Sequence, residues 1–234
     1  MKELLVYTRA DKKLTEELET LIRIQIDNSR DFRDPKDLIL AMNFDYEYNG
    51  VRSTIIPDTS YKREPECNKM PAIVWMLQHG ILPEETMWYH DFDAYQDLPF
   101  ELDTRLAFTG YGYKPQWNCG SFFFKPAAKP EFELLLKNMT GKGREDEKKL
   151  TALTNSGEIK DFDKLGVEYN YTQILYDYGR YDKVIPKVLH FHPHYQFYRA
   201  KETNLNIFMY GKSRLNRPLM SERLIEIFKK HGIK

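Results

Sequence analysis

The stretch "MWYHDFDAYQDLPF", residues 87–100, places two aspartates, Asp91 and Asp93, after an apolar run. The pattern of residues 85–96 predicts a short buried strand that runs out into these two carboxylates. Residues two apart on an extended segment point the same way, so the two carboxylates could grip one hard divalent cation. A solvated acidic turn is the alternative, because turns favour aspartate. The position favours the cation, since sites in α/β proteins form at the carboxyl ends of strands.

Two neighbours of the aspartate pair are expected to do something else. If the strand persists, the side chain of His90 points opposite to the pair and lies outside a shared cation site. Asp97 lies beyond the expected end of the strand, so we expect its carboxylate to be solvated.

Upstream of the pair, the sequence predicts a strand, a helix and a second strand. The strands are "ELLVYTR" (3–9) and "PKDLILAMNF" (35–44). Asp11 can cap the helix between them. One face of this helix is apolar and contains Leu14, Leu18, Leu21 and Ile22. This order predicts a βαβ unit and a parallel sheet.

Further elements follow along the chain. Pro71 and Gly80 suit the first turn and the end of a helix over residues 67–81. A tight Asn-Cys-Gly element opens a strand at 118–126, and the charged region 141–166 reads as a loop, a lid or a boundary. The remaining expected elements are a helix at 129–139, a late strand within 183–197 and an amphipathic helix at 221–232.

Composition limits the possible functions. A chain of 234 residues with 41% hydrophobic residues fits one large α/β domain with a real core. Lys plus Arg and Asp plus Glu balance at 35 each, so charge gives no case for a nucleic-acid or membrane-surface partner. Two cysteines, Cys67 and Cys119, favour a reducing compartment. The short apolar run at the N-terminus predicts no signal peptide and no transmembrane segment, hence a cytoplasmic location.

Three histidines alternate in the late strand, at positions 190, 192 and 194. Imidazole is a common ligand of Mn²⁺-like and Zn²⁺ ions. Pro193 interrupts the alternation, so the three are not expected to act together. His190 is the first candidate because it ends an apolar run as Asp91 does; whether His192 or His194 takes its place is open.

Other candidates have both a functional and a structural interpretation. Asn118 can present its amide to sugar hydroxyls and Gly120 allows close ligand approach, but the same residues suit a turn. Lys69, before the helix of Pro71, could meet a phosphate or lie on the surface. The acidic run at 145–147 could supply a base or form a solvated face.

In their order, these features resemble the nucleotide-diphospho-sugar glycosyltransferases of the GT-A fold. A strand ending in a threonine, a second strand ending in an aromatic-acidic turn and a lysine-led helix come first. A strand delivering Asp-Phe-Asp, an Asn-x-Gly strand and a late histidine follow. The likeness runs from Leu4 to His194.

The resemblance implies a single α/β domain over residues 1–234, with a mixed, mostly parallel sheet flanked by helices. It also implies a nucleotide-binding half at about 1–96 and an acceptor-side half at about 97–234.

The resemblance also implies roles for individual residues. Asp91, Asp93 and His190 would hold Mn²⁺ or Mg²⁺ against the diphosphate of a nucleoside-diphosphate sugar. Thr8 and Arg9 would border the nucleotide pocket. The remaining positions implied are Phe44 and Asp45 at the base or ribose, Lys69 near the phosphates or donor sugar, and Asn118 and Gly120 beside the donor and acceptor sugars.

The expected reaction is transfer of a hexosyl or pentosyl group to a hydroxyl acceptor in glycan synthesis. An inverting enzyme needs a carboxylate base, for which Asp146 and Glu147 are the candidates, and a retaining enzyme does not. Two alternatives stay open: a metal-dependent hydrolase that uses the histidines, and a non-catalytic domain that binds sugar nucleotides.

Overall fold

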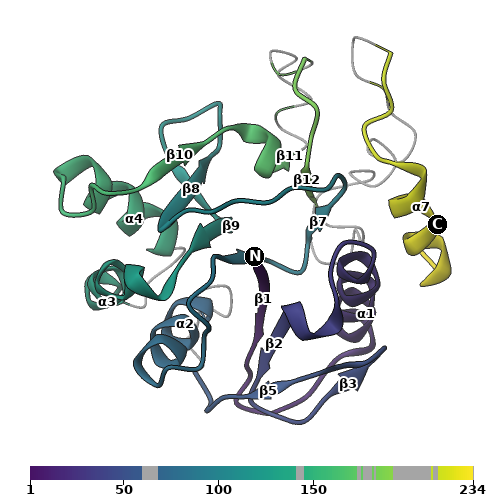
Figure 1. The fold of residues 1–234 in the computed structure, drawn as a ribbon, viewed down its shortest axis with the longest axis horizontal. Coiled ribbons are helices and arrows are strands. Elements are labelled where there is room, and N and C mark those ends of the chain that lie inside the picture. The colour runs from purple at the N-terminus through teal and green to yellow at the C-terminus, as the bar shows by residue number, and fades with distance from the viewer. Residues whose placement is uncertain are drawn as a thin grey trace.

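The computed structural model of the chain has a seven-stranded sheet with helices on both faces (Figure 1). It describes residues 1–59, 68–140, 145–172, 175, 181, 183–191, 212 and 216–233. Its mixed, mostly parallel α/β architecture confirms the expected fold class.

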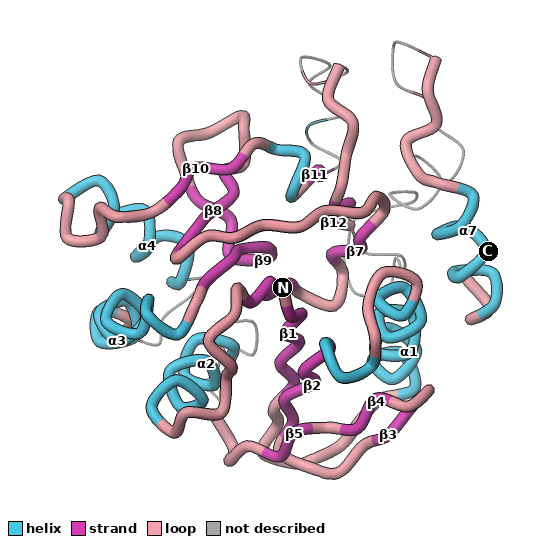
Figure 2. Tube along the Cα trace, viewed as in Figure 1, coloured by secondary structure: helices cyan, strands magenta, loops and turns pink. Residues whose placement is uncertain are grey.

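The elements follow one another along the chain as Figure 2 colours them. The helices are α1 (Glu16–Arg30), α2 (Lys69–Gln78), α3 (Lys129–Asn138), α4 (Glu145–Ser156) and α7 (Glu222–Lys230), with short 3₁₀ turns at Pro35–Asp37, Pro126–Ala128 and Val167–Tyr169. The strands of the large sheet are β1 (Lys2–Tyr7), β2 (Leu38–Met42), β5 (Thr54–Ile55), β6 (Met87–His90), β8 (Leu106–Gly110), β9 (Trp117–Phe124) and β10 (Asp163–Leu165). A two-stranded sheet contains β3 (Glu47–Tyr48) and β4 (Val51–Arg52). A three-stranded sheet contains β7 (Ala94–Gln96), β11 (Tyr171–Thr172) and β12 (Val188–His190).

The order of the large sheet is β10-β8-β9-β6-β1-β2-β5. β1 pairs in parallel with β2 on one side and with β6 on the other, which confirms the predicted βαβ unit. β9 runs antiparallel to both of its neighbours, β6 and β8. The carboxyl ends of β1, β2 and β6 therefore meet at one edge, and the chain direction of β9 brings its first residues to that same edge.

Side chains that alternate along β1 contribute to two hydrophobic cores, one on each face of the sheet. Leu4 and Val6 face a cluster shared with α2, α3 and α4, whereas Leu5 faces α1. Figure 1 shows α2, α3 and α4 on one side of the sheet and α1 on the other. Each strand thus places consecutive side chains on opposite faces.

The helix before β2 begins later than the sequence pattern indicates. Thr15 is its N-cap, and the Thr15 hydroxyl accepts a hydrogen bond from the Leu18 amide at 3.3 Å. The predicted cap, Asp11, instead forms an ion pair with Arg9 at 3.0 Å. The prediction of Asp11 as cap is wrong, because a second capping residue lies nearer the apolar face.

Two further expectations about secondary structure are corrected. The strand expected over 85–96 ends at His90, residues 91–93 form a turn, and β7 starts at Ala94 in a different sheet. The charged region 141–166, expected to be loop-like, contains the helix α4, whose Leu150 and Leu153 are buried in the core. A few apolar residues at helical spacing are enough to anchor a helix that is otherwise charged.

The prediction that Asp97 is solvated is wrong. Asp97 is 8% exposed, and its carboxylate accepts hydrogen bonds from the amide (3.1 Å) and hydroxyl of Ser221, the N-cap of α7. Burial raises the pKa of Asp97. The residue therefore attaches the C-terminal helix, predicted at 221–232 and found at Glu222–Lys230, to the β6–β7 region.

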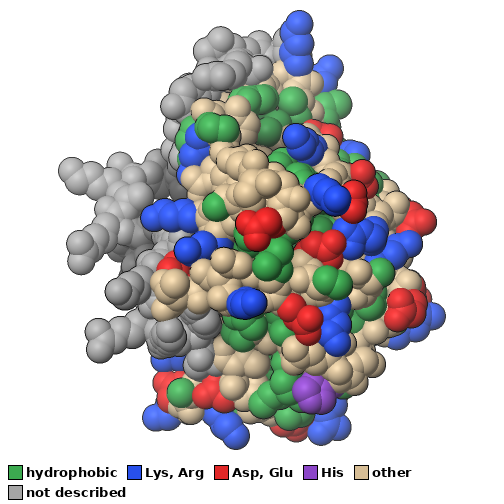
Figure 3. Space-filling model, turned by 90° about the vertical axis from the view of Figure 1, so that its left-hand side faces the viewer, with side chains coloured by type: hydrophobic (Ala, Val, Ile, Leu, Met, Phe, Trp, Pro, Cys, Tyr) green, Lys and Arg blue, Asp and Glu red, His purple; other side chains and the backbone are tan. Residues whose placement is uncertain are grey.

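The surface has mixed charge. On the face in Figure 3, lysine and arginine side chains are interspersed with aspartate and glutamate. No helix among the described residues is long and apolar enough to cross a membrane.

Candidate active site

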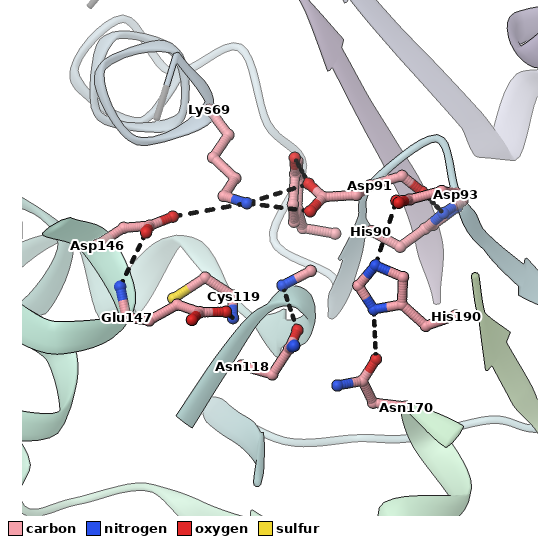
Figure 4. Close-up of polar contacts among 12 residues, drawn as sticks. Lys69, His90, Asp91, Asp93, Asn118, Cys119, Asp146, Glu147, Asn170 and His190 are labelled. Atoms are coloured by element: carbon pink, nitrogen blue, oxygen red, sulfur yellow. Dashed lines mark hydrogen bonds and ion pairs between the residues drawn. The ribbon is translucent and has the colours of Figure 1, made fainter. Parts of the chain in front are cut away.

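Three predicted cation ligands come together at the carboxyl end of β6. Asp91, Asp93 and His190 each offer one ligand atom, and these atoms lie within 4.8 Å of one another. The two aspartates sit in a turn, closed by the Ala94 amide donating to the Asp91 carbonyl at 3.0 Å. His190 reaches them because β12 pairs antiparallel with β7, with His190 opposite Ala94. A turn and a neighbouring strand, instead of one extended segment, thus gather the three ligands (Figure 4).

His190 is held from both sides of its ring. Its Nε2 lies 3.2 Å from Asp93 Oδ1, and its Nδ1 lies 2.7 Å from Asn170 Oδ1. Burial disfavours the protonated ring, but the charges of Asp93 and Asp91 outweigh this and raise the pKa of His190. A second hydrogen bond to the ring nitrogen opposite the ligand atom is what orients metal-binding histidines.

Lys69 lies on the other side of Asp91. Its ammonium group is 3.0 Å and 3.2 Å from the two Asp91 oxygens and 3.5 Å from Asp146 Oδ2. Its side chain is 6% exposed; burial disfavours the charge, but Asp91, Tyr89 and Asp146 raise the pKa of Lys69 well above its usual range. The Tyr89 hydroxyl donates to Asp91 Oδ1 at 2.6 Å. Lys69 therefore places a fixed positive charge beside Asp91, and its position near the phosphates or the donor sugar stays a prediction.

Gly120 leaves the space that this group occupies. A Cβ at position 120 would lie 2.3 Å from His190 Cε1 and 3.0 Å from Asp91 Oδ2. Asn118 accepts a hydrogen bond from the Gly120 amide at 2.6 Å, and both lie within β9, where the pairing with β8 shifts register. The Asn-Cys-Gly element is thus an irregularity inside the strand, whereas we expected it to open the strand.

Asp146 and Glu147 enter the site from the first turn of α4. Asp146 is buried and faces Lys69. Glu147 accepts hydrogen bonds from the Tyr111 hydroxyl at 2.6 Å and the Gln116 amide at 3.1 Å. Asp146 thus contacts Lys69, and Glu147 accepts a hydrogen bond from the Cys119 amide, next to Gly120, at 3.3 Å. The role of base stays a prediction for each.

The residues predicted for the nucleotide pocket lie at the ends of β1 and β2. The Thr8 hydroxyl is 2.9 Å from the Thr59 hydroxyl, and the Arg9 amide donates to Asn43 Oδ1 at 3.1 Å. Phe44 packs edge to face on Tyr7, with ring centroids 6.1 Å apart.

A further aromatic contact and one ion pair complete this end of the sheet. Tyr7 also packs against Phe92, between the two aspartates, at 6.2 Å. Aromatic contacts therefore connect the predicted pocket to the turn. Asp45 is exposed and pairs with Arg52 at 3.1 Å, so its carboxylate has a partner on the surface hairpin.

Several residues of the site escaped prediction. Tyr89 has a pattern typical of a core strand. Asn43 lies in a segment with no motif, and Asn170 belongs to an Asn-x-Thr pattern that indicates no such role. Asn68, whose amide donates to the Thr8 carbonyl at 2.9 Å, lies inside the range 67–81 predicted as a helix. His192, His194 and Cys67 lie outside the described residues. The signals available, an asparagine or a tyrosine near the end of a strand or helix and the Asn-x-Thr pattern at Asn170, are too common to single these residues out.

Known proteins match this chain in structure. No protein-family model and no curated protein matches its sequence. The apo form of the glycosyltransferase GlyE of Streptococcus pneumoniae TIGR4 matches with a TM-score of 0.56 and 16% identity, over 100% of this chain and 64% of that chain. An active-site mutant of LgtC matches with a TM-score of 0.56 and 11% identity, over 98% of this chain and 96% of that chain.

These matches confirm the resemblance to GT-A glycosyltransferases at the level of fold. This chain spans 64% of the GlyE chain and nearly all of the LgtC chain. The division into nucleotide-binding and acceptor-side halves stays a prediction.

Proposed function

We propose that the protein is a metal-dependent glycosyltransferase that moves a hexosyl or pentosyl group from a nucleoside-diphosphate sugar to a hydroxyl acceptor in glycan synthesis. One observation carries the proposal: Asp91, Asp93 and His190 converge at the carboxyl edge of a sheet whose fold is found in glycosyltransferases. In open α/β sheets, ligands bind at the carboxyl ends of the strands, at the point where the strand order reverses direction.

The donor set fits a divalent cation. Two carboxylates and one imidazole suit Mn²⁺, and Mg²⁺ is the second choice because it favours oxygen ligands. Lys69 pairs with Asp91 and Asp146, and Asp93 pairs with His190. A cation between Asp91 and Asp93 would offset the negative charge of these two carboxylates. When bound, the ion neutralises the negative charge that builds on a departing diphosphate.

The chain's own residues supply the orientation. Lys69 and Tyr89 fix the Asp91 carboxylate, and Asn170 fixes the ring of His190. Thr8 and Arg9 border the nucleotide, with Phe44 and Asp45 at its base or ribose.

The sugar-binding side lies on the other side of the cluster. Asn118 and Gly120 lie beside the donor and acceptor sugars. Asp146 or Glu147 accepts the proton of the attacking hydroxyl if the reaction inverts the anomeric carbon.

Calorimetry with Mn²⁺ and a panel of nucleoside-diphosphate sugars tests the proposal. We expect Mn²⁺-dependent binding in the wild type and a severe loss in Asp93→Ala. Asp103→Ala is the matched control, because Asp103 is an exposed aspartate that pairs with Lys125 away from the proposed cation ligands. Turnover is then followed as release of the nucleoside diphosphate.

The outcomes separate the alternatives. Absence of binding to every nucleotide sugar tested in the presence of Mn²⁺ contradicts the proposal. Tight Zn²⁺ binding with hydrolysis of a test ester and no nucleotide binding indicates the hydrolase. Nucleotide binding without any turnover of the donor under saturating Mn²⁺ indicates a non-catalytic domain.

A further inference from the structure

The turn that carries Asp91 and Asp93 is fixed at every peptide that flanks an aspartate. The Asp91 amide donates to the Gly120 carbonyl at 2.9 Å, and the Asp91 carbonyl accepts from the Ala94 amide. The Asp93 carbonyl accepts from the Phe191 amide at 2.8 Å. One peptide then remains, that between Phe92 and Asp93, and it is held by a side chain from another part of the chain.

That side chain is Gln25, in the middle of α1. Its Nε2 donates to the Phe92 carbonyl at 2.8 Å and to the Ala94 carbonyl at 2.9 Å, so both amide protons are used on the turn. Gln25 is fully buried, and both of its chain neighbours, Ile24 and Ile26, are buried apolar residues. A buried amide is costly without hydrogen bonds, so a polar residue at this position needs these two carbonyls as partners.

We propose that Gln25 is a positioning residue of the cation site. The part of this inference that concerns metal binding rests on the proposed function. Gln25 fixes the peptide before Asp93, and the Phe191 amide fixes the peptide after it. With both flanking peptides fixed, the Asp93 backbone has one conformation and its carboxylate leaves the turn in one direction, toward His190.

The amide acts through its donors and not through its shape. Among the described residues, Gln25 Oε1 has no hydrogen-bond partner, so only the NH₂ group is used. An apolar side chain of similar length would fill the same volume but leave the Phe92 and Ala94 carbonyls without donors. The two carbonyls would then be free to rotate with the turn.

Two variants and one control test the proposal in the full chain. Gln25→Glu keeps the shape and replaces the donors with a carboxylate that faces two carbonyl oxygens. Gln25→Met removes the donors without adding charge, and it carries the test if Gln25→Glu fails to fold. Leu135→Ala, a core truncation in α3, lowers stability without contact with the turn.

The measurements are the dissociation constant for Mn²⁺ and amide hydrogen exchange in the peptide containing residues 88–96. We expect Gln25→Glu and Gln25→Met to weaken Mn²⁺ binding about 10- to 100-fold, the usual effect of losing a residue that orients a metal ligand. Exchange at 88–96 should rise more than exchange elsewhere. Leu135→Ala should leave the dissociation constant within about twofold of the wild type, since sites without shared contacts act independently.

The proposal is overturned if Gln25→Met folds and binds Mn²⁺ as the wild type does, or if its loss of affinity is no greater than that of Leu135→Ala. A wild type that binds no Mn²⁺ contradicts the proposed function instead. In that case the exchange measurement alone decides whether Gln25 holds the turn.

Discussion

Two clusters of charged side chains lie on opposite faces of the sheet at the end of β6. The front cluster, defined by Lys69, Asp91 and Asp146, adjoins Asp93 and His190. The back cluster, defined by Glu3, His90 and Arg33, lies under α1. The two clusters diverge because consecutive residues of a strand point to opposite faces: Tyr89 donates to Asp91 in front, and His90 faces Glu3 behind.

The back cluster is sealed. Its three side chains are at most 4% exposed; Glu3 lies 2.8 Å from His90 Nε2 and 3.0 Å from Arg33, and it also accepts a hydrogen bond from the Ser29 hydroxyl. Burial would raise the pKa of Glu3, but Arg33 and His90 outweigh it and lower the pKa.

The front cluster has similar residue types, yet the Asp91 side chain is 33% exposed, and the adjoining Asp93 and His190 side chains are each 15% exposed. Charges that close on one another thus hold the fold together. Charges that converge at an open edge are available to a ligand.

The largest effect is expected from Glu3→Ala. The variant leaves Arg33 buried without its counter-charge and His90 without its hydrogen-bond partner, which costs about 3–5 kcal/mol of unfolding free energy. Urea denaturation measures the loss, and Asp103→Ala should stay within about 0.5 kcal/mol of the wild type. A loss below about 1 kcal/mol would show that the back cluster is not a stabilising unit.

Asp93→Ala should lower the affinity for Mn²⁺ and leave the stability of the fold almost unchanged. We expect Mn²⁺ affinity to fall at least about 100-fold, equivalent to about 2.7 kcal/mol of binding free energy, with less than about 1 kcal/mol change in unfolding free energy. Calorimetry and urea denaturation of the same preparation give both numbers. If stability falls as much as in Glu3→Ala, the distinction between the clusters fails.

Gly120→Ala should affect both properties. Its Cβ would lie 2.3 Å from the His190 ring, so the ring or the strand must move, at a cost of about 1–3 kcal/mol for overpacking. Mn²⁺ affinity should fall with it. Gly110→Ala is the matched control in β8, since the nearest atom to its added Cβ lies at 3.8 Å; an equal effect there would contradict a role specific to position 120.

The smallest effect on the unfolding free energy is expected from Lys230→Met, which removes an exposed partner of the buried carboxylate of Asp27. Asp27 is buried, and it contacts Lys230 (2.6 Å), the last residue of α7, and His231 (2.8 Å), the C-cap of that helix. Although burial opposes ionisation, these hydrogen bonds lower the pKa of Asp27 below 3.8. The stabilisation is therefore present above about pH 4 and is lost as the pH falls through the lowered pKa.

Lys230→Met should cost at most about 1 kcal/mol at pH 7, because the Lys230 side chain is 61% exposed. The difference from the wild type should vanish in acid. Denaturation curves from pH 7 to pH 2.5 measure it. A difference that grows toward low pH would mean that Asp27 does not stabilise through its charge.

Periodicity was sufficient for the elements with a clear apolar pattern. β1, β2, α2 and α7 form where their apolar residues predict them, and the order of features was enough to predict the GT-A fold and the grouping of Asp91, Asp93 and His190. The order of motifs is informative because parallel strands bring their ends to one edge.

The errors have a common physical source. The turn at 91–93, the contact of Asp97 with Ser221 and the contact of Asn170 with His190 all depend on partners distant in sequence. No local pattern records them. α4 was missed because its charged side chains hide the few apolar residues that bury one face.

The pairing of β7 with β12 has a consequence for how the protein folds. It joins positions 93 and 190, which are 97 residues apart in the chain. Closing so long a loop is slow, since its entropy is lost before the contacts form. The Phe191 amide, which follows β12, also holds the Asp93 carbonyl, so neither the turn nor the third ligand is in its final place before the late strand has docked. Full affinity for a cation would require that docking, so metal binding would report that this long-range pairing has formed.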